Sequence, residues 1–421
     1  MTGRRRFRAL PLVAMSVLVP FAGSAFAVSA LPANAAPSGP PRTPDCAWRV
    51  EASPETVNAG LLDSDAVYWV MPFAVQKDLN IVLSGTYADA RYTSLTVYDN
   101  SFAPFTTSNG VISELTDYHI APDAGSLNPW QVPASPGGHF TVTLRPDAAP
   151  GQTNVLPLAP EGTSAGRAGY LIYRVYLPTG GDHAVSLPGV AFEQDGTTVN
   201  VPLCAPGSQA GATPDMVAGM SAAATTSGDL QFARGTSSNG SLFPNPDNAY
   251  LEASVTPPGG ANVVVVRAKA PTTPGGEHPA PWPSAANLRY WSLCADLPTL
   301  PLPVVVNTLP DGTVDYGCRA DEVTALDSTG YYTFVLGTEA QRAAIDGIPG
   351  ATFVPFSTDN PTTPHVLLLR NLLGNFPYAV QNVPPDNNPA SAAAVMGSYY
   401  PQAALCPLST LQAGGPAACL S

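Results

Sequence analysis

The chain has 421 residues, with 18 basic side chains, 31 acidic side chains and a formal net charge of −13 at pH 7. Charged residues make up 12% of it, against about 25% in typical soluble domains, whereas 47 prolines and 37 glycines favour turns over long helices. The excess of acid argues against binding to nucleic acid or anionic lipid, because such affinity comes largely from lysine and arginine.

The N-terminus has the composition of an export signal. Arg4, Arg5, Arg6 and Arg8 precede a mostly apolar run to about residue 28, and small-residue cleavage patterns follow at 25–27 and 33–35. This order predicts a signal peptide over residues 1–36 and a secreted, extracellular protein, with the general and twin-arginine routes both open. Without these four arginines, 14 basic side chains remain against 31 acidic ones, a net charge of −17. No later run reaches the ~18 apolar residues of a membrane span, so none is expected in the mature chain.

The cysteine content agrees with export. In an oxidising compartment six cysteines are expected to form disulfides, although fifteen connectivities are open. Proximity along the chain favours Cys294–Cys318 and Cys406–Cys419, which leaves Cys46–Cys204. None lies in a C-x-x-C pair, so the sequence predicts neither a metal site nor a cofactor.

An internal repeat organises the mature chain. Similar motifs recur in one order, at offsets of 182 to 198 residues: Asp65-Ala-Val-Tyr68 and Asp247-Asn-Ala-Tyr250, Arg91-Tyr-Thr-Ser-Leu95 and Arg289-Tyr-Trp-Ser-Leu293, Gly138-His-Phe-Thr and Gly330-Tyr-Tyr-Thr, and Arg174 and Arg370. The motifs are short, β-branched and aromatic, and turn residues bound them. We therefore predict an all-β protein of two tandem β-sandwich, jelly-roll-like domains from an internal duplication.

The predicted boundaries follow the repeat. The first copy spans 37–204, a Gly/Ala/Ser-rich linker spans 205–242, and the second copy spans 243–421 and ends in a disulfide-closed tail. Two short helices are expected, at 214–224 and 389–396, because each segment begins with proline.

Part of the first copy resembles a bacterial domain family of unknown function. Residues 91–99, Asn154-Val-Leu-Pro157 with Pro160, and Arg174-Val-Tyr-Leu-Pro178 follow its pattern R-Y-x-S-x-x-x-Y-D, N-x-L-P-x-x-P and R-x-Y-x-P, with Thr93 and Val155 where tryptophan is usual. The second half, including residues 395–401, resembles secreted proteins of unassigned role. The resemblance implies export and a β-sandwich, and it carries no activity.

Acidic loop residues offer the best acid–base chemistry. Asp117, His119 and Asp123 lie close together in a predicted loop of the first copy. Two facing carboxylates could cleave a glycosidic bond, but aspartate in such loops usually makes a turn. Residues 162–166 match G-x-S-x-G without the strand–turn–helix context of serine hydrolases, so we interpret them as a loop.

Loop tryptophans and the repeated arginines are the candidate ligand-binding residues. Trp130 and Trp282 could stack against sugar rings or anchor their loops in the core. Arg91 and Arg289 occupy equivalent positions of the two copies. This favours a structural role, such as a buried arginine–carboxylate pair with Asp65 or Asp247.

The sequence is compatible with two classes of function, one catalytic and one not. The leading hypothesis is a non-catalytic binding or scaffold module of the cell envelope or outside, with a glycan or cell-wall partner. The alternative is an extracellular hydrolase of glycans or esters that uses the acidic loop. A hydrolase would show converging carboxylates or histidine in a pocket, whereas a binding module would show exposed aromatic rings without them.

Overall fold

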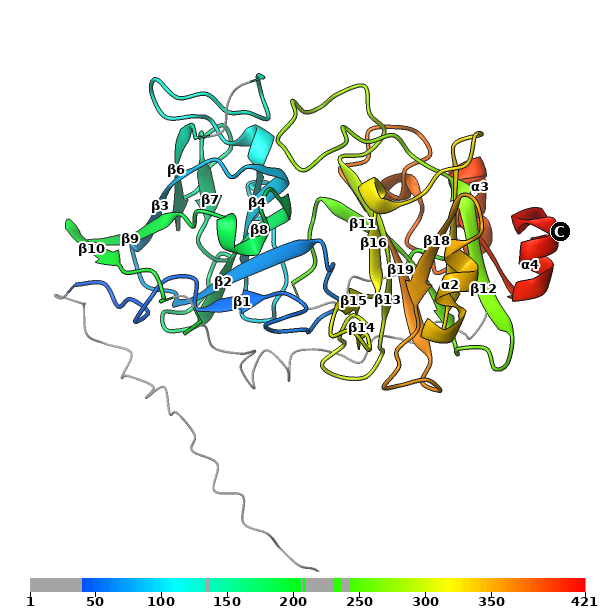
Figure 1. Ribbon diagram of the computed structural model, residues 1–421. Helices are drawn as coiled ribbons and strands as arrows, with labels where there is room; N and C mark the ends of the chain where they lie inside the picture. Colours follow the sequence, from blue (N-terminus) through cyan, green and yellow to red (C-terminus); the bar gives the residue numbers. More distant parts are fainter. Residues whose placement is uncertain (1–39, 134–136, 206, 209–229, 236–242, 421) are drawn as a thin grey trace, which may run out of the picture. The chain divides into compact units, whose positions relative to one another are not determined.

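A computed structural model describes residues 40–133, 137–205, 207–208, 230–235 and 243–420, which fall in one compact unit. The predicted signal peptide and the helix expected at 214–224 lie outside the described residues. Within the described ranges, no helix is long and apolar enough to cross a membrane. Most of the regular structure is β-strand, arranged in two pairs of sheets (Figure 1).

The first copy contains two five-stranded sheets. In spatial order, one sheet consists of β1 (Val50–Ala52), β2 (Ala66–Ala74), β8 (Ala168–Pro178), β4 (Ala90–Tyr98) and β5 (Glu114–Thr116). The other consists of β10 (Thr197–Val201), β9 (Gly189–Gln194), β3 (Asn80–Thr86), β6 (His139–Arg145) and β7 (Val155–Pro157).

The second copy contains two four-stranded sheets and a small ribbon. One sheet has the order β11 (Asn248–Val255), β19 (His365–Leu372), β13 (Tyr290–Asp296) and β16 (Cys318–Ala320). The other has the order β18 (Ala351–Pro355), β17 (Tyr331–Gly337), β12 (Asn262–Lys269) and β20 (Gln402–Pro407). The ribbon pairs β14 (Val306–Thr308) with β15 (Val314–Tyr316).

The two copies share one topology. The order β2-β8-β4-β5 in the first copy corresponds to β11-β19-β13-β16 in the second, and β9-β3-β6-β7 corresponds to β20-β12-β17-β18. The pairs β6·β7 and β17·β18 are parallel, and the other neighbours in these four-strand sets are antiparallel. The prediction of two tandem sandwiches from a duplication is confirmed.

Alternation along the strands explains the two cores. In β4, Leu95 and Val97 point into the first core, whereas Tyr92 and Tyr98 lie on the opposite face. That second face is also buried, because Tyr92 packs in a cluster that includes Tyr290 of the second copy. A strand covered on both faces needs apolar residues on both, which accounts for its two-sided pattern.

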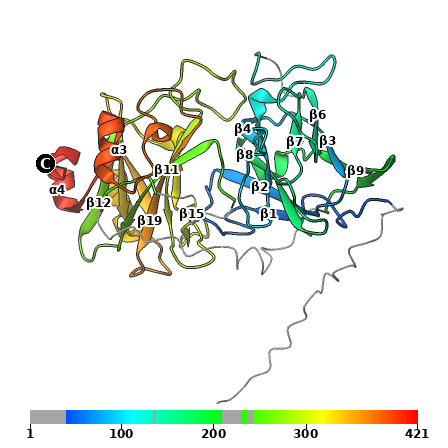
Figure 2. The same ribbon diagram turned by 180° about the vertical axis from the view of Figure 1, so that it is seen from behind.

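Helices among the described residues are short: α2 (Arg342–Asp346), α3 (Pro389–Met396) and α4 (Leu408–Gly414). The prediction of a helix at 389–396 is confirmed. Asn388 caps α3 by accepting the Ala390 N–H at 3.0 Å, and Pro389 occupies the first turn, where a missing N–H costs no hydrogen bond. Both views place α3 in the second copy (Figure 1, Figure 2).

Three disulfides join the cysteines in the pairing that chain proximity favours. Cys46–Cys204 links the two ends of the first copy, where Ala47 also bridges Leu203. Cys294–Cys318 joins opposed residues of β13 and β16, and Cys406–Cys419 ties the C-terminal tail after α4 to β20. Each disulfide therefore stabilises one copy and none links the two copies.

Candidate functional site

The two repeated arginines at the starts of β4 and β13 form ion pairs between the copies. Nη2 of Arg289 donates to both carboxylate oxygens of Asp117 at 3.1 Å, and both side chains are fully buried. Nη1 of Arg91 donates to the carboxylate of Asp321 at 3.0 and 3.3 Å. Asp117 and Asp321 begin the equivalent 3-10 turns η1 (Asp117–His119) and η3 (Asp321–Val323).

The two arginines do not pair with the expected aspartates, Asp65 and Asp247. The arginines reach across to the other copy, whereas Asp247 accepts hydrogen bonds from Tyr92 at 2.8 Å and Thr116 at 2.7 Å. The predicted buried arginine–carboxylate pairs form, but Asp65 and Asp247 were the wrong partners, because each arginine lies on the face that the other copy covers and meets Asp117 or Asp321 there.

Both candidate tryptophans lie against Arg289. The Cζ atom of Arg289 is 5.9 Å from the ring centre of Trp130 and 5.6 Å from that of Trp282, so the guanidinium makes a cation–π contact with each ring. The backbone N–H of Trp282 donates to the backbone carbonyl of Trp130 at 2.9 Å. Trp130 is 0% exposed and Trp282 is 7% exposed. In this arrangement the rings cover a buried cation, and sugar stacking by them stays a prediction.

The acidic loop residues contact different partners. Asp117 also accepts the Thr93 N–H at 2.6 Å, and burial raises its pKa to about 6 against the opposing effect of Arg289. His119 is exposed and contacts Tyr118 with ring centres 3.9 Å apart and the ring planes tilted by 40°. Asp123 accepts the Thr141 hydroxyl at 3.1 Å. The three side chains are therefore used in three separate contacts, and their catalytic role stays a prediction.

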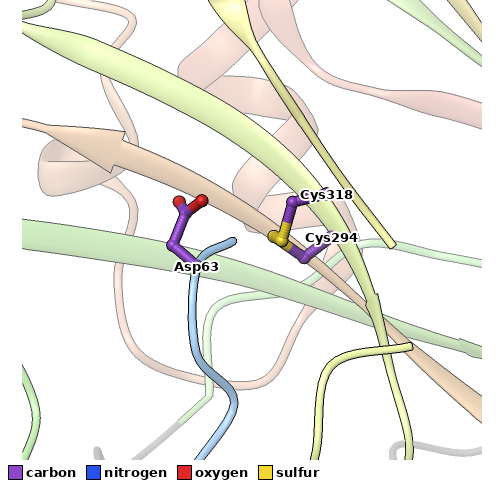
Figure 3. Close-up of side chains that lie close together, drawn as sticks. All are labelled: Asp63, Cys294 and Cys318. Carbon is purple, nitrogen blue, oxygen red and sulfur yellow. A yellow bond between two sulfur atoms is a disulfide. The ribbon is translucent and has the colours of Figure 1, made fainter. Parts of the chain in front are cut away.

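Asp63 lies beside the disulfide of the second copy (Figure 3). Its carboxylate and the two sulfur atoms lie within 4.8 Å of one another. Asp63 accepts hydrogen bonds from Tyr290 at 2.9 Å and Ser292 at 2.7 Å. Metal binding by cysteine requires thiolates, and here the sulfurs are bonded to each other, so this group is a structural contact of the first copy with β13.

A small cavity lined by aromatic rings lies in the second copy. Its volume is about 10 Å³, close to the minimum for one water molecule. The lining comes from β13, β17 and β19, from the segment that follows β19 and from a proline just after β12: Trp291, Tyr332, Leu369, Asn371, Phe376, Met396, Tyr399 and Pro271. No histidine or carboxylate is part of this lining.

The segment after β19 distinguishes this copy from the first. Residues 179–188 connect β8 to β9, whereas the equivalent connection from β19 to β20 runs over 373–401 and includes η5 (Val380–Asn382), α3 and η6 (Gly397–Tyr399). Phe376, Met396 and Tyr399 come from this longer connection. The cavity is thus built by an element that the first copy lacks.

Three rings of this connection form what we call the aromatic cluster: Phe376, Tyr378 and Tyr399. Tyr378 stacks on Tyr399 at 5.6 Å with an interplanar angle of 20°, and Phe376 meets Tyr399 edge-on at 5.0 Å. Tyr378 is 48% exposed, so the cluster extends from the cavity to the surface. Burial of large aromatic side chains is the usual outcome of folding, which makes an exposed stacked pair informative.

One hydroxyl in the cavity lining lacks a partner. The Tyr332 hydroxyl oxygen is buried and has no hydrogen-bond partner among the described residues. Burial raises the pKa of Tyr332 above its usual range, so the hydroxyl keeps its proton. It can therefore donate to a water or ligand oxygen.

The sequence-based prediction of sites did not include the aromatic cluster. It gave weight to tryptophans and to charged loops, whereas the cluster consists of phenylalanine and tyrosine in the extended C-terminal part. The available signal was the comparison of the copies, because residues 373–401 have no counterpart of similar length in the first copy.

The described residues define an all-β protein of two duplicated, disulfide-bonded sandwiches, the second of which carries an aromatic cavity. No family model and no curated protein matches the chain. A solved structure of an uncharacterised protein from Burkholderia cenocepacia is similar, with a TM-score of 0.51 and 10% identity over 86% of this chain and 82% of that one. The VPA0106 protein from Vibrio parahaemolyticus matches with a TM-score of 0.38 and 11% identity, over 82% of this chain and 91% of its own. The Burkholderia likeness is one of fold alone.

Proposed function

We propose that this is an exported, non-catalytic binding protein that holds a sugar ring on the aromatic cluster of its second copy. The exposed stacking of Tyr378 on Tyr399 carries the proposal. A pyranose ring has an apolar face that packs on a flat aromatic side chain, while its hydroxyl groups stay in water or meet polar atoms.

The size of the cavity defines how such a ligand would lie. A volume of about 10 Å³ accepts one water molecule or one polar group, and it excludes a whole sugar ring. The ring would therefore rest at the surface, against the exposed side of the stacked Tyr378–Tyr399 pair. The Tyr332 hydroxyl could donate a hydrogen bond to a hydroxyl of the ligand or to a bridging water.

The disulfides support an extracellular site of action, and the charge supports a glycan as the partner. The three disulfides suit an oxidising compartment. Nucleic acids and anionic lipid surfaces need many basic side chains, and the chain has only 18 against 31 acidic ones, so a glycan or cell-wall polymer is the partner class that best fits both the composition and the rings.

The test is a calorimetric titration of the purified, oxidised mature protein with each member of a panel of cell-wall and plant oligosaccharides. Tyr378→Ala and Tyr399→Ala should each weaken binding of a positive sugar about tenfold, which corresponds to ~1.4 kcal/mol. Tyr118→Ala, which removes a partly exposed tyrosine in contact with the His119 ring of the first copy, is the matched control and should leave affinity unchanged.

Two results would contradict the proposal. Binding that survives both tyrosine substitutions would place the ligand elsewhere. Turnover of a bound sugar or ester that His119→Ala or Asp123→Asn abolishes, in a variant that stays folded, would instead support the alternative, an extracellular hydrolase that acts through the loop of Asp117, His119 and Asp123.

A further inference from the structure

The aromatic cluster has a cation beside it. Lys269, the last residue of β12, is partly exposed, and its Nζ atom lies 5.4 Å from the ring centre of Tyr399. Only one other lysine, Lys77, occurs in the chain. Among the described residues Lys269 forms no ion pair, whereas Lys77 pairs with Asp78 at 3.7 Å. A charge without a counterion therefore stands at the edge of the proposed binding platform.

A second cation on the same strand shows the ordinary arrangement. Arg267 lies two residues before Lys269, so both side chains project from one face of β12. Arg267 stacks over Tyr331 at 4.9 Å, donates to Thr333 at 2.7 Å and forms an ion pair with Asp327. Its charge is neutralised within the protein, and that of Lys269 is not.

The composition of the chain makes an unpaired lysine ammonium unusual. The chain has 31 acidic residues for 18 basic ones, so carboxylates are abundant as partners. A cation–π contact with Tyr399 contributes about 0.5–1 kcal/mol at an exposed site, but it leaves the ammonium hydrogens free to bind an oxygen. Lys269 is thus positioned to receive an anion from a group resting on the neighbouring ring.

We propose that the ligand of the aromatic cluster is an acidic sugar whose carboxylate pairs with Lys269 while its ring packs against the exposed side of the stacked Tyr378–Tyr399 pair. This inference rests on the proposed function and names its ligand class. The rings supply affinity for any pyranose, and Lys269 selects the charged one, because an ion pair forms only with the acid.

An acidic sugar can come from a plant uronic-acid polymer or from a bacterial cell wall, so the experiment uses two pairs of probes, each with one acid and one neutral sugar. One pair is trigalacturonate and its methyl ester, which share a backbone and differ in charge. The other is N-acetylmuramic acid and N-acetylglucosamine, which differ by a lactyl carboxylate. Affinities are measured by calorimetry on the oxidised full mature protein. The acid that matches the natural source should bind at least tenfold more tightly than its neutral partner.

Substitutions at the lysines separate charge from folding. Lys269→Gln should lower the affinity for the preferred acid about tenfold and remove most of its weakening by salt, while affinity for the neutral partner stays constant. Lys269→Arg should retain binding of the acid. Lys77→Gln, which alters the exposed lysine of the first copy, is the matched control and should change nothing.

The outcomes distinguish this inference from the proposed function. Equal binding of acid and neutral sugar in both pairs, or an unchanged acid affinity in Lys269→Gln, overturns the role of Lys269 and leaves the stacking proposal intact. If Tyr378→Ala binds both the acid and the neutral sugar as tightly as the native protein does, the aromatic cluster is not the binding site. Failure of both acids to bind overturns the acidic ligand, and the neutral panel then decides on the platform.

Discussion

Arg91 and Arg289 bind each other's backbone across the two copies. Nη1 of Arg91 donates to the Arg289 carbonyl at 3.2 Å, and Nε of Arg289 donates to the Arg91 carbonyl at 2.9 Å. Each guanidinium then forms an ion pair with an aspartate of the other copy, Asp321 or Asp117. Reciprocal contacts between equivalent residues are the signature of a two-fold interface between identical subunits.

Other contacts repeat this reciprocity. Arg174 donates to the Phe243 carbonyl at 2.6 Å, and the equivalent Arg370 donates to the Leu61 carbonyl at 2.5 Å. Tyr92 and Tyr290 likewise contact Asp247 and Asp63 of the opposite copies. The copies therefore pack as the subunits of a homodimer do, which is a natural result if the duplicated gene first encoded a dimer. The repeated arginines serve this packing.

The buried Arg289–Asp117 pair should be essential for stability. Asp117→Asn leaves a buried guanidinium without its counterion, and breaking such a pair costs about 3–5 kcal/mol. The control is Asp147→Asn, which breaks the exposed Arg145–Asp147 pair, whose side chains are 38% and 66% exposed, and should cost less than ~1 kcal/mol. Urea unfolding at pH 7.5 measures both. Equal losses in the two variants would contradict the structural role given to Asp117.

The fold could be predicted from the sequence because the duplication gives internal evidence for strand boundaries. Asn80 and Asn262 start equivalent strands, and Pro389 starts α3 where the sequence placed it. The interface could not be predicted, because Arg289 and Asp117 are 172 residues apart and no local pattern links them. The aromatic cluster was missed for a related reason: Tyr378 and Tyr399 become neighbours only through the fold of the connection after β19.

Stability should fall as the pH rises from about 4 to about 8. Burial raises the pKa of Asp65 to about 7 and that of Asp296 to about 8, from ordinary values of 3.8. The native state then holds protons that the unfolded chain releases over this range, so the free energy of unfolding declines with pH. Both carboxylate oxygens of Asp296 lack hydrogen-bond partners among the described residues, which makes its ionised form costly.

Asp296→Asn tests the contribution of that group. The amide has nearly the same shape and carries no charge, so the variant should show a flatter pH profile and at least ~1 kcal/mol more stability than the native protein at pH 8.5. Asp147→Asn should leave the slope between pH 5 and 8 unchanged, since Arg145 lowers the pKa of Asp147. Urea unfolding at half-unit pH steps gives the profile, and a native profile that is flat from pH 4 to 8 would refute the prediction.

Tyr332→Phe should leave stability within about 0.5 kcal/mol of the native value or increase it, because a buried hydroxyl without a partner gains nothing from the protein. Tyr87→Phe is the comparison, since the Tyr87 hydroxyl donates to the Ile120 carbonyl at 3.0 Å and its loss should cost about 1 kcal/mol. Thermal unfolding of both variants decides. An equal loss in Tyr332→Phe would mean that a water in the cavity satisfies the hydroxyl.

The Cys294–Cys318 disulfide should resist reduction for as long as the protein stays folded. The two residues are 0% and 3% exposed, and the first copy covers them: the Ser64 N–H lies 3.3 Å from the Cys318 sulfur. Cys419, in contrast, is partly exposed in the C-terminal tail. Because thiol–disulfide exchange requires access to a sulfur atom, a phosphine reductant under native conditions should open Cys406–Cys419 before Cys294–Cys318.

Timed alkylation followed by mass spectrometry measures the order of reduction. The expected sequence is labelling of Cys406 and Cys419 within the first time points, with Cys294 and Cys318 labelled only at the rate of global unfolding. In 6 M guanidinium the difference in rate should vanish, because protection comes from the packing of the copies and not from the local sequence. Early labelling of Cys294 in the folded protein would mean that the copies separate readily, and it would also weaken the case for the reciprocal interface of Arg91 and Arg289.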